Sequence, residues 1–201
     1  MTKHFDHIGL PETRSFIAER LSDDTLLGRN GLIMRDSTYV LPYDPAQQSS
    51  ARELVAALAA DDLPSRGVKA AVVNLYDIVL DYLDEQDMWE SLCEAEAGVS
   101  RNEIIMMLQD TVSVSEIIRP EVQRRIEETG CDLAFITGVG ETFPYVRTHS
   151  LLSELEVEVP VVLVFPGQYR QSPDGSTSLD VLGIPSSANG GYYRATNVFD
   201  L

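Results

Sequence analysis

The stretch from Cys131 to Leu155 constrains the fold more than any other part of the chain. Residues Leu133 to Ile136 are a continuous apolar run without polar alternation, which is the pattern of a strand covered on both faces. Gly138 and Gly140 follow, and glycine permits φ values that a Cβ would penalise. The stretch therefore predicts a central parallel strand and a sharp turn at its carboxyl end, where open α/β sheets place their sites.

A helix is predicted directly after this turn. Pro144 is suited to a first helical turn, and apolar residues recur at helical spacing across residues 145–155. Arg147 and His149 would lie in the first turns of that helix, near the glycine turn and able to point toward it. Together with Glu141 they could bind an anion or transfer protons, because histidine titrates near neutrality and arginine pairs with phosphate or carboxylate. An internal network of these three residues that fixes the turn is the favoured interpretation.

The rest of the chain alternates between strands and helices. Predicted helices cover Glu12 to Leu21, Ser49 to Leu58 (with Ser49 or Ser50 as its cap) and Asp77 to Leu83; predicted strands cover Thr38 to Leu41, Val68 to Leu75 and Val159 to Phe165. Residues 168–178 read as a polar loop, and residues 179–182 could form a further short strand.

This alternation predicts a single α/β domain over residues 1–201, with helices on both faces of a mostly parallel sheet of four or five strands. The architecture would be Rossmann-like or P-loop-like, without a phosphate-binding loop. A helical insert is expected at about residues 84–128, before the chain returns to the sheet.

Two loops occupy places where nucleotide-binding proteins hold phosphate. The loop YDPAQQSS, residues 43–50, has neither the glycines nor the lysine of a P-loop. The turn TGVGE lacks the third glycine of a dinucleotide fingerprint, so a structural turn is the favoured interpretation. The candidate residues for a polar cleft or ligand site are Asp44, Asn74, Gly138, Gly140, Glu141, Arg147 and His149.

No complete catalytic set is visible. There is no G-x-S-x-G motif, and neither Cys93 nor Cys131 stands beside a basic residue. His4, His7 and His149 do not have metal-ligand spacing. We therefore expect no catalytic residue, metal or cofactor. Two distant cysteines also indicate a reduced, cytoplasmic compartment rather than a disulfide scaffold.

The chain is strongly acidic. It carries 32 acidic against 15 basic residues, a net charge of −17, and only Lys3 and Lys69 are lysines. Direct nucleic-acid binding is not expected, since such proteins usually display a basic stripe. The charge serves solubility or reflects a salt-rich or high-GC host. Residues 1–16 lack the layout of a signal peptide, and no apolar run approaches the roughly 20 residues that cross a bilayer, so the protein is expected to be neither exported nor embedded in a membrane.

Several segments together resemble the BrxB family of bacteriophage exclusion (BREX) defence systems. They span about three quarters of the chain in the family's order, which makes the set specific although each piece alone is not. The segments are Tyr43-Asp44-Pro45 with Arg52 and Glu53, Asn74-Leu75-Tyr76, residues 137–141 with Pro144, Arg147 and residues 149–152, Phe165-Pro166-Gly167 with Tyr169, and residues 192–195.

The resemblance implies a small non-catalytic component of an antiphage complex, encoded beside a methyltransferase, a large ATPase and a phosphatase-like protein, PglZ. It would act by binding other BREX proteins, most of all PglZ, and it could also bind a second copy of itself. Aromatic residues and arginine anchor many interfaces, and the candidates here are Trp89, Tyr169, Tyr192, Tyr193 and Arg194.

Two alternatives stay open at this point. Tyr192, Tyr193 and Arg194 could close a sheet edge instead of binding a partner, because an edge must be covered. The cleft above Gly138 could also bind a nucleotide or another small anion at the helix start, which would make the chain a regulatory or weakly hydrolytic α/β protein.

Overall fold

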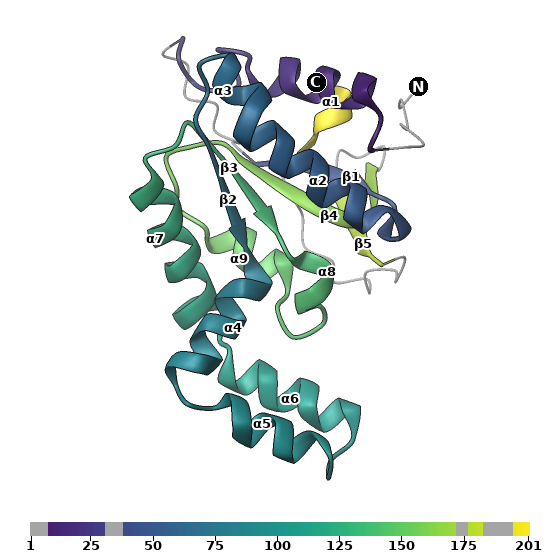
Figure 1. Ribbon diagram of the computed structural model, residues 1–201, viewed down its shortest axis with the longest axis vertical. Coiled ribbons are helices and arrows are strands. Elements are labelled where there is room, and N and C mark those ends of the chain that lie inside the picture. The colour runs from purple at the N-terminus through teal and green to yellow at the C-terminus, as the bar shows by residue number, and fades with distance from the viewer. Residues whose placement is uncertain (1–7, 31–37, 172–176, 183–194) are drawn as a thin grey trace.

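A six-stranded sheet lies at the centre of the computed structural model, which describes residues 8–30, 38–171, 177–182 and 195–201 (Figure 1). The strands run in the order β2-β3-β4-β1-β6, and β5 pairs with β4 outside this path. Only the β4–β5 pair is antiparallel among the described pairings, so the predicted α/β class with a mostly parallel sheet is confirmed. The strands are β1 (Thr38–Tyr43), β2 (Ala70–Asn74), β3 (Leu133–Thr137), β4 (Val161–Gln171), β5 (Thr177–Val181) and β6 (Thr196–Asn197).

Strand β3 occupies the interior position that the sequence predicts. It pairs with β2 on one side and β4 on the other, and Leu133 through Ile136 are each 0% exposed. A strand with two neighbours and two covered faces needs apolar side chains throughout, which explains the unbroken run. Asn74 lies opposite Thr137 in the register, so the ends of β2 and β3 lie side by side.

Helices cover both faces of this sheet, and the alternation of side chains along each strand feeds two separate cores. Phe135 packs in the core that contains Ile17 of α1 and Leu54 of α2. Its neighbour Ile136 packs in the other core, with residues of α4, α7 and α9. The helices are α1 (Pro11–Leu21), α2 (Gln48–Ala57), α3 (Leu63–Ser65), α4 (Leu75–Glu85), α5 (Trp89–Glu96), α6 (Arg101–Thr111), α7 (Arg119–Thr129), α8 (Val139–Thr142) and α9 (Thr148–Glu154).

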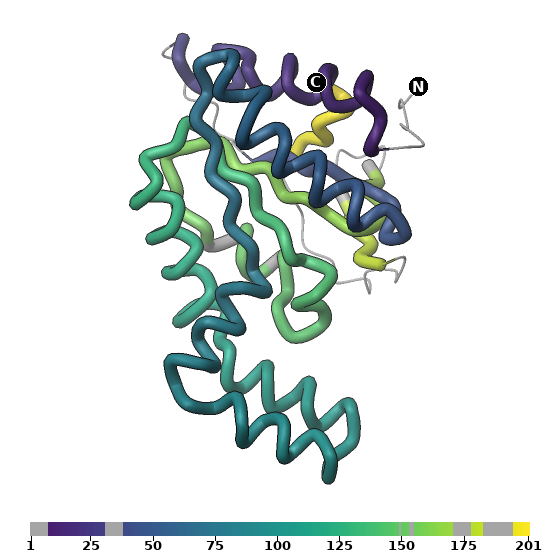
Figure 2. Tube along the Cα trace, viewed as in Figure 1, coloured from purple at the N-terminus to yellow at the C-terminus, as the bar shows by residue number. Residues whose placement is uncertain are grey.

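Helices α5 and α6 form a hairpin that extends away from the sheet (Figures 1 and 2). Neither helix contains a buried residue. The predicted insert at about residues 84–128 includes this hairpin, but α7 returns to the body of the molecule and contacts β2. The part that lies off the sheet is therefore shorter than the predicted insert.

The helix after the glycine turn begins later than predicted. Pro144 does not lie in a first helical turn; it lies between the short α8 and α9, which starts at Thr148. Phe143 ends α8 in an extended conformation, with φ −75° and ψ 136°. This fits the steric restriction that a proline places on the residue before it.

The predicted helix caps at Ser49 and Ser50 are also wrong. Helix α2 begins at Gln48 after a 3₁₀ turn, η1 (Pro45–Gln47), and its N-cap residue Gln47 makes no side-chain capping hydrogen bond. The side chain that caps this region is Asp44, which accepts a hydrogen bond from the Ala46 N–H at 2.9 Å. The helix start is thus set by the turn before it.

Strand β4 is longer than its apolar run. It pairs with β1 through Pro166 and from Gly167 onward pairs with β5, so residues 168–171 and 177–178 are strand and not the predicted loop. A Cβ at Gly167 would lie 2.0 Å from the Asp180 carbonyl oxygen, which shows how closely the two strands approach. Gly167, two residues past the end of the predicted strand, permits this change of partner strand.

Strand β1 likewise continues past Leu41 to Tyr43 through a proline. Its other neighbour, β6, pairs only with Tyr39 and Val40, so β1 has no strand partner on that side at Pro42 among the described residues. A missing N–H is tolerated at such an edge position. The two-residue β6 accounts for a sixth strand where four or five are predicted.

None of the helices in the described ranges has the length and apolar character that a bilayer crossing requires.

Candidate functional site

The carboxyl ends of the parallel strands border two hollows, and most of the predicted polar residues lie there. The first, called here the strand-end cleft, has a volume of about 290 Å³ and lies between α2 and the ends of β2 and β3. Its polar lining consists of Tyr43, Gln48, Arg52, Asn74, Asp77, Thr137 and Glu141. Three predicted residues, Asn74, Gly138 and Glu141, are therefore brought together in one place.

Asn74 and Gly138 form the floor of the strand-end cleft. The Asn74 side chain caps α4, because its Oδ1 accepts a hydrogen bond from the Tyr76 N–H at 3.0 Å. Gly138 lies against this cap with φ 81°, and a Cβ there would approach Asn74 Oδ1 to 2.1 Å and the Tyr76 nitrogen to 2.9 Å. The helix start and the turn after β3 thus pack directly on each other, and only glycine fits.

Glu141 holds α8 to α2 across the cleft. Its Oε1 accepts hydrogen bonds from Gln48 Nε2 at 2.6 Å and from Arg52 Nη2 at 3.1 Å. Gln48 and Arg52 are four residues apart and lie on one side of α2. The arginine that pairs with Glu141 therefore comes from α2 and is not the predicted Arg147, and Gln48 adds a second hydrogen bond to the same carboxylate.

Tyr43 borders the same network. Burial raises the pKa of the Tyr43 hydroxyl to about 12, with Glu141 adding to the shift and Arg52 opposing it. The phenol consequently stays protonated at neutral pH and can donate a hydrogen bond but cannot serve as a base. Because Asp77 and Glu141 both line the cleft, an anion entering it would face two carboxylates.

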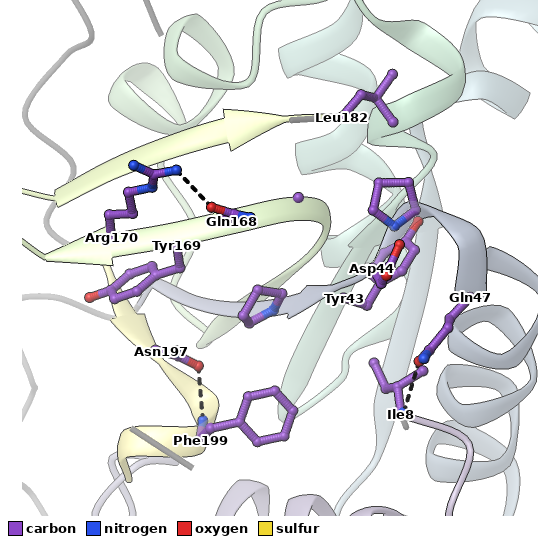
Figure 3. Close-up of a pocket in the computed structure, with 13 residues that line it drawn as sticks. Ile8, Tyr43, Asp44, Gln47, Gln168, Tyr169, Arg170, Leu182, Asn197 and Phe199 are labelled. Carbon is purple, nitrogen blue, oxygen red and sulfur yellow. Dashed lines mark hydrogen bonds between the residues drawn. The ribbon is translucent and has the colours of Figure 1, made fainter. Parts of the chain in front are cut away.

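The second hollow, called here the β1–β4 pocket, has a volume of about 770 Å³ and lies where β1 and β4 end (Figure 3). Asp44, Tyr169 and Asn197 line it. The Tyr169 hydroxyl donates a hydrogen bond to the Ala195 carbonyl oxygen at 3.0 Å, which ties β4 to the residue that precedes β6. Tyr169, predicted as a partner-binding residue, thus braces two segments of the chain.

Among the remaining cleft candidates, Gly140 and Arg147 do not line the strand-end cleft. Gly140 lies within α8, where a Cβ would contact Pro166 at 3.2 Å. Arg147 is exposed, precedes α9 and makes no capping hydrogen bond with its side chain. His149 lies in α9, and its side chain is outside the described part of the structure. Arg147 is not among the described residues that line the strand-end cleft.

The partner-binding candidates are also divided. Trp89 is the first residue of α5 and is 43% exposed. Tyr192, Tyr193 and Arg194 fall outside the described residues. Within the described ranges, no group of three or more histidine, cysteine or acidic residues could hold a metal ion.

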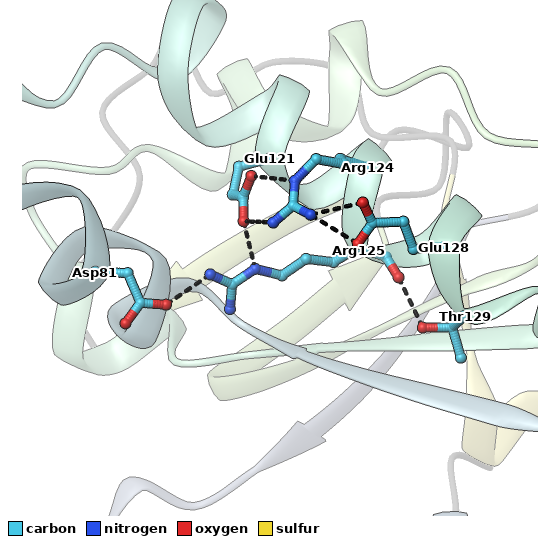
Figure 4. Close-up of polar contacts among 6 residues, drawn as sticks. All are labelled: Asp81, Glu121, Arg124, Arg125, Glu128 and Thr129. Carbon is cyan, nitrogen blue, oxygen red and sulfur yellow. Dashed lines mark hydrogen bonds and ion pairs between the residues drawn. The ribbon is translucent and has the colours of Figure 1, made fainter. Parts of the chain in front are cut away.

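A polar network that the sequence reasoning missed joins α7 to α4 (Figure 4). Glu121 accepts hydrogen bonds from Arg124 and from Arg125, each at 2.6 Å, and Arg125 continues to Asp81 of α4 at 2.7 Å. The hydrogen bond with Arg124 is the largest of the effects that lower the pKa of Glu121 to about 2. The spacing of three and four residues is a visible signal for the pairs within α7, whereas the link to Asp81 depends on tertiary packing.

Residues 71–198, more than half of the chain, match the family described as "BREX protein BrxB". The chain belongs to the BrxB family. It is 24% identical over 190 residues to a BREX protein BrxB of Bacillus cereus (strain H3081.97), an alignment that covers 92% of this chain and 94% of the relative. It is 26% identical over 184 residues to a BREX protein BrxB of Escherichia coli O9:H4 (strain HS), with 90% and 87% covered. No solved structure matches it.

As a BrxB-family member, the chain is a component of BREX antiphage defence, which implies association with other BREX proteins. The resemblance found from the sequence is thereby confirmed. The matched range includes β2 from its second residue, β3, β4 and the α5–α6 hairpin, and hence the floor of the strand-end cleft.

Proposed function

We propose that this BrxB-family protein has no catalytic activity of its own and acts by binding the phosphatase-like PglZ subunit of its BREX system. The family match supports a role inside a multi-protein defence system. The molecular role is supported by the way in which the polar residues at the strand ends are used.

The observation that carries the proposal is that each of these residues is hydrogen-bonded within the chain itself. Asn74 is engaged with the start of α4, Asp44 with η1, and Glu141 with Gln48 and Arg52. Nucleotide-binding α/β proteins use polar groups at the strand ends to bind their ligand. In this chain the polar side chains at the same position stabilise its own turns and helix starts. Loops that are held in place in this way lose little conformational freedom on binding, which suits a protein that presents a fixed surface to a partner.

The test is co-purification of a tagged copy with PglZ from the same gene cluster, at low and at high salt, followed by light scattering of the complex and of the isolated protein. We expect a complex with a defined stoichiometry at low salt. Its association should weaken as salt rises, because a strongly acidic chain attracts its partner by charge.

The same preparation tests the nucleotide- or anion-binding alternative. A panel of nucleotides and inorganic phosphate should leave the melting temperature unchanged, whereas a ligand at about 100 times its dissociation constant would stabilise the fold by roughly 2.7 kcal/mol. A folded monomer that captures no PglZ at either salt concentration and turns over nucleotide would contradict the proposal.

A further inference from the structure

The α5–α6 hairpin, residues 87–111, exposes more large apolar side chains than any other described segment of comparable length. Seven large hydrophobic residues are exposed in the described part of the chain, and four of them lie here. They are Trp89 (43% exposed), Val99 (37%), Met106 (61%) and Met107 (40%). Apolar side chains gathered on one projecting element mark an interaction surface more often than singly scattered ones do.

The hairpin is held in a defined position although neither of its helices contains a buried residue. Ser100 and Glu103 form a capping box at the start of α6, with the Ser100 N–H donating to Glu103 at 2.7 Å. Leu92 of α5 and Leu108 of α6 pack against the core that contains Ile136. Gln109 Nε2 donates to the Pro144 carbonyl oxygen at 3.3 Å, which joins α6 to the loop before α9. A surface fixed in this way loses little conformational freedom on binding.

The hairpin is also acidic. Arg101 is its one basic residue, against six acidic residues: Asp87, Glu90, Glu94, Glu96, Glu103 and Asp110. None of the ion pairs found in the described ranges uses any of these six carboxylates. The acids Glu121 and Glu128 of α7, by contrast, are paired with arginines of the same helix. The carboxylates of the hairpin are therefore exposed on the same segment as its exposed apolar side chains.

The negative charge of the hairpin determines which kind of partner could bind it. A second copy of the chain would set acidic residues against acidic residues, and like charges across an interface oppose binding. Nucleic acid and anionic lipid surfaces are repelled for the same reason. A protein surface with arginine or lysine around an apolar patch matches both features, since aromatic residues and methionine are enriched at interface cores and methionine adapts to irregular partners.

We propose that the α5–α6 hairpin is the docking element of this protein for a partner with a basic, partly apolar surface. Trp89, Met106 and Met107 supply the apolar contacts, and Glu90, Glu94 and Glu96 supply charges that steer the partner. The inference rests on the proposed function and adds to it the surface and the chemistry of its partner.

The experiment measures the Kd and the association rate for purified PglZ with the full-length protein and its variants, at 50 mM and 300 mM NaCl. Met106→Ser/Met107→Ser and Trp89→Ala should each raise the Kd at least about tenfold, because truncation of central apolar anchors dominates interface energetics. Glu90→Lys/Glu94→Lys should slow association and weaken its dependence on salt.

Two matched controls separate local from general effects. Leu10→Ser replaces a large side chain that is 46% exposed but lies at the start of α1. Glu19→Lys/Glu127→Lys changes the net charge by the same amount on α1 and α7, at exposed positions. Both controls should bind PglZ as the unaltered protein does, to within about twofold.

The outcomes distinguish the two proposals. If the unaltered protein binds PglZ and the hairpin variants bind equally well, the hairpin inference is wrong and the proposed function stands. If the unaltered protein does not bind, both fall together. The charge-reversal pair stays informative even if Trp89→Ala unfolds, because Glu90 and Glu94 are exposed and their replacement removes no packing.

Discussion

At the scale of single residues, the close approach of Gly138 to Asn74 determines the shape of the cleft floor. The capping bond from Tyr76 to Asn74 places an oxygen directly over the turn after β3. A side chain at Gly138 would displace that oxygen or the backbone nitrogen behind it. The cleft therefore depends on a residue without a side chain at this position as much as on its polar groups.

We expect Gly138→Ala to destabilise the fold by at least about 2 kcal/mol, because the left-handed conformation costs a Cβ roughly 1–2 kcal/mol and the contact with Asn74 adds to it. Gly67→Ala is the matched control, since Gly67 has φ 73° and no atom within 4 Å of the point where a Cβ would lie. Urea unfolding of the two variants measures the difference. Equal losses at the two positions would mean that the close approach to Asn74 carries no energetic weight.

The sequence locates part of this site. It predicts Asn74, Gly138 and Glu141 as candidates for one polar cleft, and the structure brings them together because the ends of parallel strands meet at one edge of the sheet. It predicts Arg147 as the basic partner because that residue is near Glu141 in the chain. The structure uses Arg52 instead, which is 89 residues away from Glu141. Which helix crosses above a turn depends on packing that local spacing does not encode.

At the scale of secondary structure elements, the ion-pair network on α7 connects the helix to its neighbour α4. Glu121 is the shared acceptor, with 24% of its side chain exposed, while Arg124 and Arg125 are 53% and 28% exposed. Solvent screens such partly exposed pairs, so each contributes modestly. Their combined effect is to fix the crossing of α4 and α7 on one face of the sheet.

The network makes stability depend on pH in a definite direction. The pKa of Glu121 is lowered from its ordinary value of 4.5 to about 2 in the folded protein. The folded state therefore gains stability from ionised Glu121 at pH values above 4.5, and loses that gain as pH falls from 4.5 toward 2.

Glu121→Gln should lower the free energy of unfolding at pH 7 by about 1 kcal/mol, and its difference from the unaltered protein should shrink as pH falls below 4.5. Glu127→Gln, an exposed change on the same helix, is the control and should have little effect at any pH. Urea unfolding between pH 7 and pH 3 checks both. A difference for Glu121→Gln that stays constant across this range would show that its ionisation does not stabilise the fold.

The sequence predicts element boundaries well where hydrophobic pattern decides them and poorly where contacts decide them. Strand β3 and helix α1 follow their apolar residues within one position. Strand β4 extends past its apolar run because β5 supplies a second partner, and α9 starts late because Phe143 precedes a proline. The hydrophobic pattern indicates which residues are buried, whereas hydrogen bonding to a distant segment has no signal in the local sequence.

At the scale of the whole molecule, the excess of negative charge is the property that can be read most directly from the sequence. The net charge of −17 is distributed over a chain in which the described ion pairs engage few of the 32 acidic residues. Self-repulsion of this kind destabilises a compact state, while under the docking proposal the same field would direct a basic partner toward the hairpin. Stability and association should consequently respond to salt in opposite directions.

We expect the melting temperature at pH 7.5 to rise when NaCl increases from 0.01 M to 0.5 M, because the Debye length falls from about 30 Å to less than about 8 Å and repulsion between distant carboxylates is screened. Each kcal/mol of repulsion removed should raise the melting temperature by about 2–4 °C in a chain of this size. At pH 5, closer to the pI of about 4.4, the net charge is smaller and the same salt change should have a smaller effect. Calorimetric melts at the two pH values and four salt concentrations test this, and a melting temperature that falls with NaCl at pH 7.5 would show that attractive ion pairs outweigh the repulsion.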